Sequence, residues 1–250
     1  FSTRAYPAVE KWRFVYIWMG DPALADESLI PDWRWCDDPQ WSARGETLPV
    51  NCHATLLRDN LLDLSHAHFV HARTLATDAV ISAPIQVEES DNTVIVRRNM
   101  DGIAPSPFFR RILGGFDGKV NHHQLIRFEP PASIVIELTV WDPANIECRA
   151  NLRVMNFLTP ATDRTSLYFW SLARNMSLQD DALDDWIFKA NRNTFFEDVD
   201  VIEKQQDLLE RAPAPVRQLL FHVDGGVNAG RKLVARLLED EAARINAAAQ

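Results

Sequence analysis

Two histidines five positions apart carry the clearest chemical signal of the sequence. His66 and His71 lie in the segment NLLDLSHAHFVH, where apolar spacing predicts a helix from Ala54 to Val70. On an ideal helix the two side chains would lie roughly 140° apart, so one metal ion could bind both only if the helix ends or bulges between them. Because paired imidazoles often just bond to nearby carbonyl groups, these residues alone leave that alternative open.

A carboxylate further along the chain could complete a metal site. Asp198 lies on the apolar face of a predicted helix, because Phe195, Val201 and Ile202 lie three or four positions away. A carboxylate that faces a core is strongly destabilised unless a cation compensates, and a metal ion, an arginine or a lysine could supply that charge. Glu197 has mostly polar neighbours, which predicts a solvated side chain and makes it the weaker candidate.

Two imidazoles and one carboxylate, with open coordination positions, are typical of the facial triad of non-haem iron(II) oxygenases. A closed zinc site usually has a fourth protein ligand, whereas a hydrolytic zinc site can also use two histidines and one carboxylate. The residue types therefore favour mononuclear Fe(II) held by His66, His71 and Asp198, with zinc as the alternative.

The elements that must position these residues indicate an α+β fold. Residues 12–19 predict a strand, and the tryptophan-rich stretch after it predicts an ordered loop region. Between residues 84 and 175, successive short runs with β character predict an antiparallel sheet. Helical spacing returns over residues 178–211 and 228–248. We expect an antiparallel β-sheet flanked by helices.

Composition excludes several classes of partner. The 250 residues carry a net charge of −9, which disfavours nucleic acid, and no apolar run approaches the length of a membrane span. Cys36, Cys52 and Cys148 are odd in number and show no CxxC pairing, which indicates a reducing compartment. We therefore expect a cytoplasmic protein.

Several segments resemble the Rieske non-haem iron oxygenases, and within them the vanillate O-demethylase oxygenase group. DNLLDLSHAHFVHARTL is similar to that group's iron-binding helix, and FFEDVDVIEKQQ is similar to its carboxylate-donating helix. The resemblance continues through YPAVEKWRFVYIWMGDP, IRFEPPASIVIEL, NFLTPATDRTSLYFWSLARN and HVDGGVNAGRKLVARLLEDE, so it runs nearly end to end. It implies the helix-grip-like catalytic fold of these enzymes.

The resemblance also implies a role for each residue of the motifs. His66, His71 and Asp198 match the iron ligands. Asp63 matches an acidic residue that bonds to a ligand histidine and links the iron to a Rieske cluster on a neighbouring subunit, although an ordinary solvated aspartate is the alternative. Asn60 matches a residue near the iron, and with Asp63 and His66 it would share one helix face.

A polar strand residue is the expected substrate contact. Asn156 matches a polar position of the family, and its alternative is a solvent-facing strand residue. His122 and His123 begin a strand and are expected to be surface residues rather than substrate contacts. The pocket itself should be built by the concave side of the sheet and the loops near the iron.

The family's Rieske domain is not found in this sequence. A [2Fe-2S] Rieske cluster needs C-x-H followed by C-x-x-H, and neither pattern occurs, so this chain has no ligands for that cluster. We expect residues 1–22 to be the exit from an N-terminal Rieske domain that is otherwise absent, and residues 23–250 to be the catalytic iron domain. The family also implies a homotrimer.

The implied activity is aromatic monooxygenation. The resemblance implies O-demethylation of a methoxylated, vanillate-like aromatic acid with O2, yielding a phenol and formaldehyde. Electrons would come from NADH through a separate flavin and iron–sulfur reductase. The alternatives are hydroxylation, N-demethylation or cis-dihydroxylation of another aromatic at the same iron, or a non-catalytic module that binds an apolar ligand.

Overall fold

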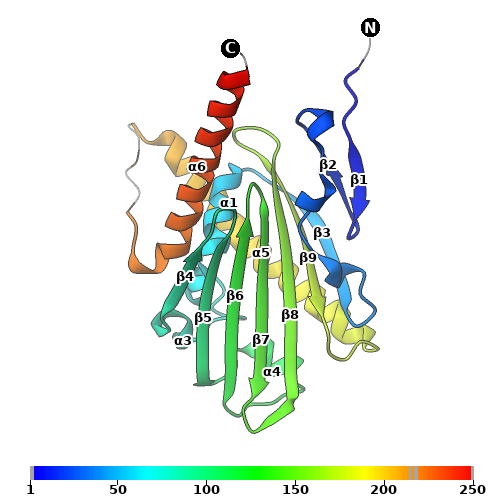
Figure 1. The fold of residues 1–250 in the computed structure, drawn as a ribbon. Helices are drawn as coiled ribbons and strands as arrows, with labels where there is room; N and C mark the ends of the chain where they lie inside the picture. The colour runs from blue at the N-terminus through cyan, green and yellow to red at the C-terminus, as the bar shows by residue number, and fades with distance from the viewer. Residues whose placement is uncertain (1–2, 214–215, 217–218, 249–250) are drawn as a thin grey trace.

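A seven-stranded antiparallel sheet forms the centre of the molecule (Figure 1). The computed structural model describes residues 3–213, 216 and 219–248. The strand order in the sheet is β3-β9-β8-β7-β6-β5-β4. The strands are β3 (Ser42–Val50), β4 (Ile85–Glu89), β5 (Val94–Ile103), β6 (Val120–Glu129), β7 (Ser133–Asp142), β8 (Asn145–Pro160) and β9 (Ser166–Arg174).

Side-chain alternation gives the sheet two different faces. In β6 every second residue from Val120 to Phe128 is buried, and the residues between them are only partly buried. The register pairs His122 with Val140 of β7 and Gln124 with Arg98 of β5, so these four side chains share one face. Polar groups are therefore brought into the apolar layer beneath the helices.

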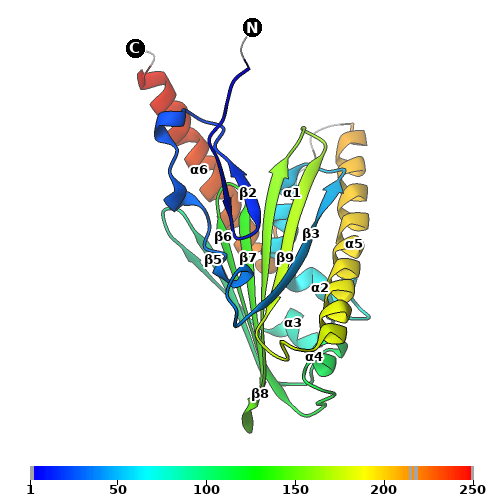
Figure 2. The same ribbon diagram turned by 90° about the vertical axis from the view of Figure 1, so that its right-hand side faces the viewer.

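Helices cover this face of the sheet (Figure 2). The cover consists of α1 (Ala54–Leu62), α2 (Ala67–Val70), α3 (Asp78–Ser82), α4 (Pro107–Ile112), α5 (Asp181–Arg211) and α6 (Gly225–Ala248). Asp180 starts the long α5 helix by accepting a hydrogen bond from the Leu183 amide, and Ile187, Phe195 and Ile202 form its buried stripe. The main hydrophobic core lies between these helices and the sheet.

The opposite face carries the N-terminal segment. A hairpin of β1 (Ala8–Lys11) and β2 (Phe14–Ile17) leads into the 3-10 turns at Pro22–Leu24, Glu27–Leu29 and Arg34–Cys36. Trp33 is fully buried there, with its ring 4.9 Å from that of Phe14, and it packs in a second apolar cluster with Val135 and Met155. Two further 3-10 turns lie at Leu64–His66 and His222–Asp224.

The antiparallel sheet flanked by helices confirms the expected fold class, and two local predictions are wrong. The predicted strand over residues 12–19 is shorter, because Trp12 and Arg13 have φ angles of 55° and 65° and form the hairpin turn. The tryptophan-rich region was expected to be an ordered loop, but its last part forms β3, which pairs with β9 along its whole length. Among the described residues, no helix has the combined length and hydrophobicity that a membrane span requires.

Candidate metal centre

The histidine segment is a broken helix. α1 ends at Leu62, Asp63 is extended with φ −123° and ψ 99°, and a 3-10 turn at Leu64–His66 precedes α2. α2 ends at Val70, so His71 lies in the cap position beyond it. The helix therefore does end between the two histidines, as their spacing required. The additional break at Asp63 means that Asn60 and His66 do not share one continuous helix.

This geometry brings the three expected ligands together. One donor atom each from His66, His71 and Asp198 lies within 4.8 Å of the others. The Nε2 atoms of His66 and His71 are both 3.3 Å from Asp198 Oδ1. His71 and Asp198 are buried, with side chains only 2% and 7% exposed. His68, between the two histidines in sequence, does not belong to this group of described residues.

The other nitrogen of each imidazole is already occupied. His66 Nδ1 lies 2.6 Å from the main-chain carbonyl oxygen of Asp63, and His71 Nδ1 lies 2.8 Å from Oε2 of Glu197. Since carbonyl and carboxylate oxygens accept, both Nδ1 atoms donate, so each Nε2 atom faces Asp198, with a lone pair when the imidazole is neutral and with a proton when it is an imidazolium. Two imidazole lone pairs and one carboxylate oxygen around one point are a suitable donor set for iron(II).

The ionisable side chains of the site shift one another's pKa values. Burial raises the pKa of Asp198, but hydrogen bonds and positive charge from His66 and His71 outweigh burial and lower it to about 2. Burial lowers the pKa of His71, and hydrogen bonds and charge from Asp198 and Glu197 reverse that effect and raise it. Among the described residues, Asp198 forms no ion pair with arginine or lysine. The cation expected for this buried carboxylate is therefore a metal or an imidazolium.

Asn60 supports the carboxylate ligand. Its Nδ2 atom donates a hydrogen bond to Asp198 Oδ1 at 3.3 Å. Because α1 carries Asn60 and α5 carries Asp198, this bond joins the two helices at the site. The contact places Asn60 beside one of the three candidate ligands.

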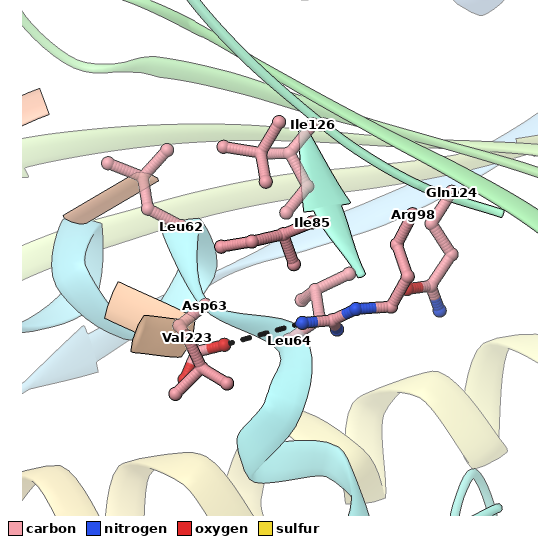
Figure 3. Close-up of a pocket in the computed structure, with 9 residues that line it drawn as sticks. Leu62, Asp63, Leu64, Ile85, Arg98, Gln124, Ile126 and Val223 are labelled. Atoms are coloured by element: carbon pink, nitrogen blue, oxygen red, sulfur yellow. Dashed lines mark ion pairs between the residues drawn. The ribbon is translucent and has the colours of Figure 1, made fainter. Parts of the chain in front are cut away.

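Asp63 differs from its expected geometry. Its main-chain carbonyl, not its carboxylate, bonds to His66, because the extended backbone at Asp63 turns the carbonyl toward the imidazole. The carboxylate accepts from Ser65 and lies 3.9 Å from Nη2 of Arg98 (Figure 3). Burial lowers the pKa of Arg98, and the negative charge of Asp63 opposes that shift. Asp63 thus links a ligand histidine to a buried guanidinium.

A cavity of about 90 Å³ opens directly onto the three ligands. By the same measure one water needs roughly 10–15 Å³, so the cavity admits a small organic ligand. Its walls are mainly apolar and come from helices and sheet alike, including Leu61, Leu64, Ala67, Leu75, Val80, Phe109, Ile136, Leu138, Val154 and Phe195. An apolar cavity beside a metal centre is a suitable binding site for an aromatic substrate.

The tandem histidines of β6 are not both surface residues. His122 is 6% exposed and lines the cavity, where its ring lies 4.5 Å from that of Phe109. Burial, together with the charge of His123, lowers its pKa to about 3. His123 points to the opposite face and pairs with Asp101 at 2.9 Å. The surface prediction was wrong for His122 because strand alternation turns one of two adjacent residues inward.

Asn156 is neither a substrate contact nor a solvent-facing residue. It is fully buried, and its Nδ2 donates to the carbonyl oxygens of Ile134 and Val154 at 3.0 and 3.1 Å. Its Oδ1 accepts from the Tyr168 hydroxyl at 2.7 Å. With these three bonds made, and with no place among the cavity-lining residues, Asn156 serves the core between β7, β8 and β9.

Two residues of α5 were missed. Glu197 is 41% exposed, as a solvated residue should be, yet it bonds to His71, and no sequence pattern pointed to that contact. Asn191 also lines the cavity. It lies on the same face of α5 as Thr194 and Asp198, three and seven positions before them. That spacing was available in the sequence and could have identified Asn191.

Comparisons with known proteins place this arrangement in a family. Residues 50–240 match the model of the vanillate O-demethylase oxygenase C-terminal domain. A vanillate O-demethylase oxygenase subunit from a Pseudomonas species is 35% identical over 96% of this chain and 76% of its own. The iron–sulfur subunit of a toluene-4-sulfonate monooxygenase system from Comamonas testosteroni is 32% identical, over 95% and 71%.

Solved structures agree. A crystal structure of dicamba monooxygenase bound to 3,6-dichlorosalicylic acid superposes with a TM-score of 0.87 at 28% identity, covering 96% of this chain and 72% of that chain. A structure of dicamba monooxygenase with non-heme iron and dicamba gives 0.80 at 26%, covering 96% and 70%. With the sheet, the broken helix and the buried triad in the same chain, the protein belongs to the vanillate O-demethylase oxygenase family of Rieske oxygenases.

Proposed function

We propose that this chain is the catalytic part of an oxygenase component that O-demethylates a methoxylated aromatic compound, using O2 and electrons from a separate reductase. The observation that carries the proposal is the buried group of His66, His71 and Asp198 opening onto an apolar cavity. Relatives named as vanillate and dicamba O-demethylase oxygenase components support the reaction type.

The residues of the site divide the work of holding the metal and the substrate. His66 Nε2, His71 Nε2 and Asp198 Oδ1 would hold iron(II), which when bound supplies the activation of O2 for insertion of oxygen into a C–H bond. Asn60 fixes the Asp198 carboxylate by its hydrogen bond. Apolar walls that include Phe109 and Leu138 would hold the aromatic ring and limit access of water.

The connection to the electron supply is part of the proposal. We propose that Asp63 lies between the iron site and a [2Fe-2S] Rieske cluster of a neighbouring subunit in a cytoplasmic homotrimer, as the resemblance implies. The bond from the Asp63 carbonyl to His66 supports a structural link at this point.

A second reaction on the same site has its own support. The relative that belongs to a toluene-4-sulfonate monooxygenase system is 32% identical, which favours hydroxylation of a ring methyl group as the alternative. Both reactions insert oxygen into a C–H bond of a methyl group, which is joined to the ring through oxygen in one case and directly in the other, so the cavity does not separate them. Product analysis does.

Iron binding tests the site. Protein reconstituted anaerobically with Fe(II) should bind about one iron per chain, and Asp198→Ala should lose it because one of three ligands is removed. Asp200→Asn is the control, since this residue lies on the same helix with its side chain 66% exposed. Equal iron content in the parent and in Asp198→Ala would contradict the proposal.

Formaldehyde release tests the reaction. A full-length oxygenase component that contains this chain and its Rieske cluster, loaded with iron and supplied with a reductase and NADH, should release formaldehyde from at least one member of a panel of methoxybenzoates and methoxyphenols. Hydroxylated products without formaldehyde from the whole panel would support the methyl or ring hydroxylation alternative instead.

A further inference from the structure

A buried arginine lies beside the break in the histidine segment. Arg98 is 5% exposed and lies on the inner face of β5, with Val94 and Val96. Its guanidinium is directed at Asp63, with Nη2 3.9 Å from Asp63 Oδ1 (Figure 3). In the part of the chain that the structure describes, Asp63 is the only carboxylate within ion-pair distance of Arg98. Arg98 does not line the larger cavity, so direct contact with a substrate is not its role.

The buried charge of Arg98 depends on Asp63. A guanidinium keeps its charge in proteins, and its burial is strongly unfavourable unless an anion compensates. Nε of Arg98 is buried and has no hydrogen-bond partner among the described residues. The space beside the two side chains measures about 10 Å³, which is room for about one water. The charges of Arg98 and Asp63 therefore attract each other with little screening.

The Asp63 carboxylate is held from two sides. Its Oδ1 accepts from the Ser65 amide at 2.9 Å, and its Oδ2 accepts from the Ser65 hydroxyl at 2.5 Å. Ser65 belongs to the histidine segment, whereas Arg98 belongs to the sheet. The main chain of Asp63 is extended, and its carbonyl oxygen lies 2.6 Å from His66 Nδ1. A continuous series of contacts thus leads from the sheet, through Asp63, to a candidate metal ligand.

We infer that Arg98 is a positioning residue of the metal site. The attraction of its guanidinium for the Asp63 carboxylate holds the Asp63 carbonyl against His66 Nδ1, and this bond orients His66 Nε2 toward the metal. Because 3.9 Å is longer than a hydrogen bond, the attraction needs a positive charge but not the shape of a guanidinium. The inference rests on the proposed function, because it treats His66 as a metal ligand.

Fe(II) affinity of the full chain, measured anaerobically by competition with a chelator, tests the role of the charge. Arg98→Met removes the charge and keeps an unbranched side chain, so affinity should fall about 10–100-fold. Arg98→Lys keeps the charge and should stay within about threefold of the parent. Arg97→Met is the matched control, because Arg97 is on the other face of β5 and pairs with Glu88. Equal affinity in parent and Arg98→Met, or equal loss in Arg98→Lys, overturns the inference.

A double-mutant cycle separates positioning through Asp63 from a general loss of packing. Asp63→Asn removes the charge that attracts Arg98, so it should itself weaken Fe(II) binding about tenfold. Arg98→Met combined with Asp63→Asn should stay within about threefold of the weaker single variant, because both changes break the same contact. Arg98→Met combined with Glu197→Ala should instead multiply the two losses, because Glu197 supports the other histidine. Multiplied losses in the first pair, or unchanged affinity in Asp63→Asn, overturn the inference.

His66 reports its own orientation without iron. In protein saturated with Zn(II), NMR of ¹⁵N-labelled histidine should show a slowly exchanging Nδ1 proton of His66, assigned by its loss in His66→Gln, because this proton is bonded to the Asp63 carbonyl. The signal should persist in Arg98→Lys and Arg97→Met and exchange rapidly in Arg98→Met. Unchanged exchange in Arg98→Met overturns the inference.

The test does not depend on one variant. If Arg98→Met does not fold, the double variant with Asp63→Asn leaves no unpaired charge buried, and its affinity is compared with that of Asp63→Asn alone. Equal values support the inference, and a further tenfold loss overturns it. A parent that binds no Fe(II) contradicts the proposed function, and the His66 signal of the zinc-loaded protein then still decides the inference.

Discussion

Three carboxylates surround the two histidines, and each has a different environment. Asp198 is buried and faces both Nε2 atoms, Glu197 is 41% exposed and bonds to one Nδ1, and Asp63 directs its carboxylate at Arg98. Neighbours in sequence thus have opposite exposure, because adjacent positions on α5 point in directions about 100° apart. The environments of these individual side chains determine the metal affinity and the acid–base behaviour of the site.

Removing Glu197 should weaken iron binding without removing a ligand. Glu197→Ala deletes the acceptor that orients His71, so Fe(II) affinity should fall about 10–100-fold. Glu197→Gln keeps an uncharged acceptor and should lie between parent and alanine variant. Competition with a chelator measures the affinity, with Asp200→Asn as the control on the same helix. Unchanged affinity in Glu197→Ala would show that His71 needs no such support.

His122 should make stability depend on pH. Its pKa is about 3 in the folded protein against 6.5 for a free histidine, so below pH 6.5 the unfolded chain binds a proton that the folded chain does not. The free energy of unfolding therefore falls as pH drops, by about 2 kcal/mol from pH 7 to 5. Urea unfolding should show this contribution missing in His122→Phe and present in His123→Phe. A parallel pH dependence in parent and His122→Phe would contradict it.

The three residues that meet at the candidate metal site could be predicted, whereas the groups that support them could not. His66, His71 and Asp198 were identifiable because residue type, apolar spacing and family resemblance agreed. The contact of Glu197 depends on how α5 is rotated against α2, which no local pattern encodes. For His122, alternation requires one of two adjacent histidines to face inward, but it does not say which.

At the scale of elements, the ends of helices position the site. α1 ends at Leu62, and the extended Asp63 turns the chain so that His66 faces Asp198 on α5. The start of α6 packs against that same end, because Gly226 faces the Leu62 carbonyl and Val96 of β5. The absence of a side chain at Gly226 lets the two helices meet.

Alanine at Gly226 should disturb this junction. A Cβ atom there would lie 2.9 Å from the Leu62 carbonyl oxygen and 2.5 Å from Val96 Cγ2, so the helix must shift. We expect Gly226→Ala to lower the free energy of unfolding by about 1–3 kcal/mol. Gly225→Ala is the matched control, because its Cβ would meet only side-chain methyl groups at 3.3 Å. Denaturant unfolding of both variants decides, and equal stability would contradict the close contact.

Most of the elements could be predicted, and the failures have local causes. The long runs of β4 to β9 and the periodic helices α5 and α6 carry clear signals. β3 was missed because Gly45 and Pro49 interrupt its sequence, and its strand character comes from pairing with β9. The break at Asp63 was missed because the apolar spacing continues across it.

At the scale of the whole molecule, the candidate metal site joins distant parts of the chain. His66 and His71 precede the six strands β4 to β9, and Asp198 follows them. A metal that binds all three residues links α2 to α5 across the cavity, and it binds only when the sheet and helices are assembled. Metal binding should therefore stabilise the whole fold.

Iron should raise the melting temperature. Free Fe(II) at 100 times its dissociation constant adds about 2.7 kcal/mol to the free energy of unfolding. For a chain of this size that corresponds to a rise of roughly 5–10 °C in Tm. Anaerobic calorimetry should show the rise in the parent and in Asp200→Asn but not in Asp198→Ala. A rise of equal size in all three would indicate binding elsewhere.

The two walls of the cavity have separate structural origins. The three candidate metal ligands come from the broken helix and α5, whereas His122, Gln124, Ile136, Leu138 and Val154 come from strands of the sheet. Substitutions on the strands can therefore change the choice of substrate while the iron chemistry stays intact. This division gives evolution, or a protein engineer, a way to obtain new substrates from one oxidative centre, and relatives named for vanillate, dicamba and toluene-4-sulfonate are consistent with such a history.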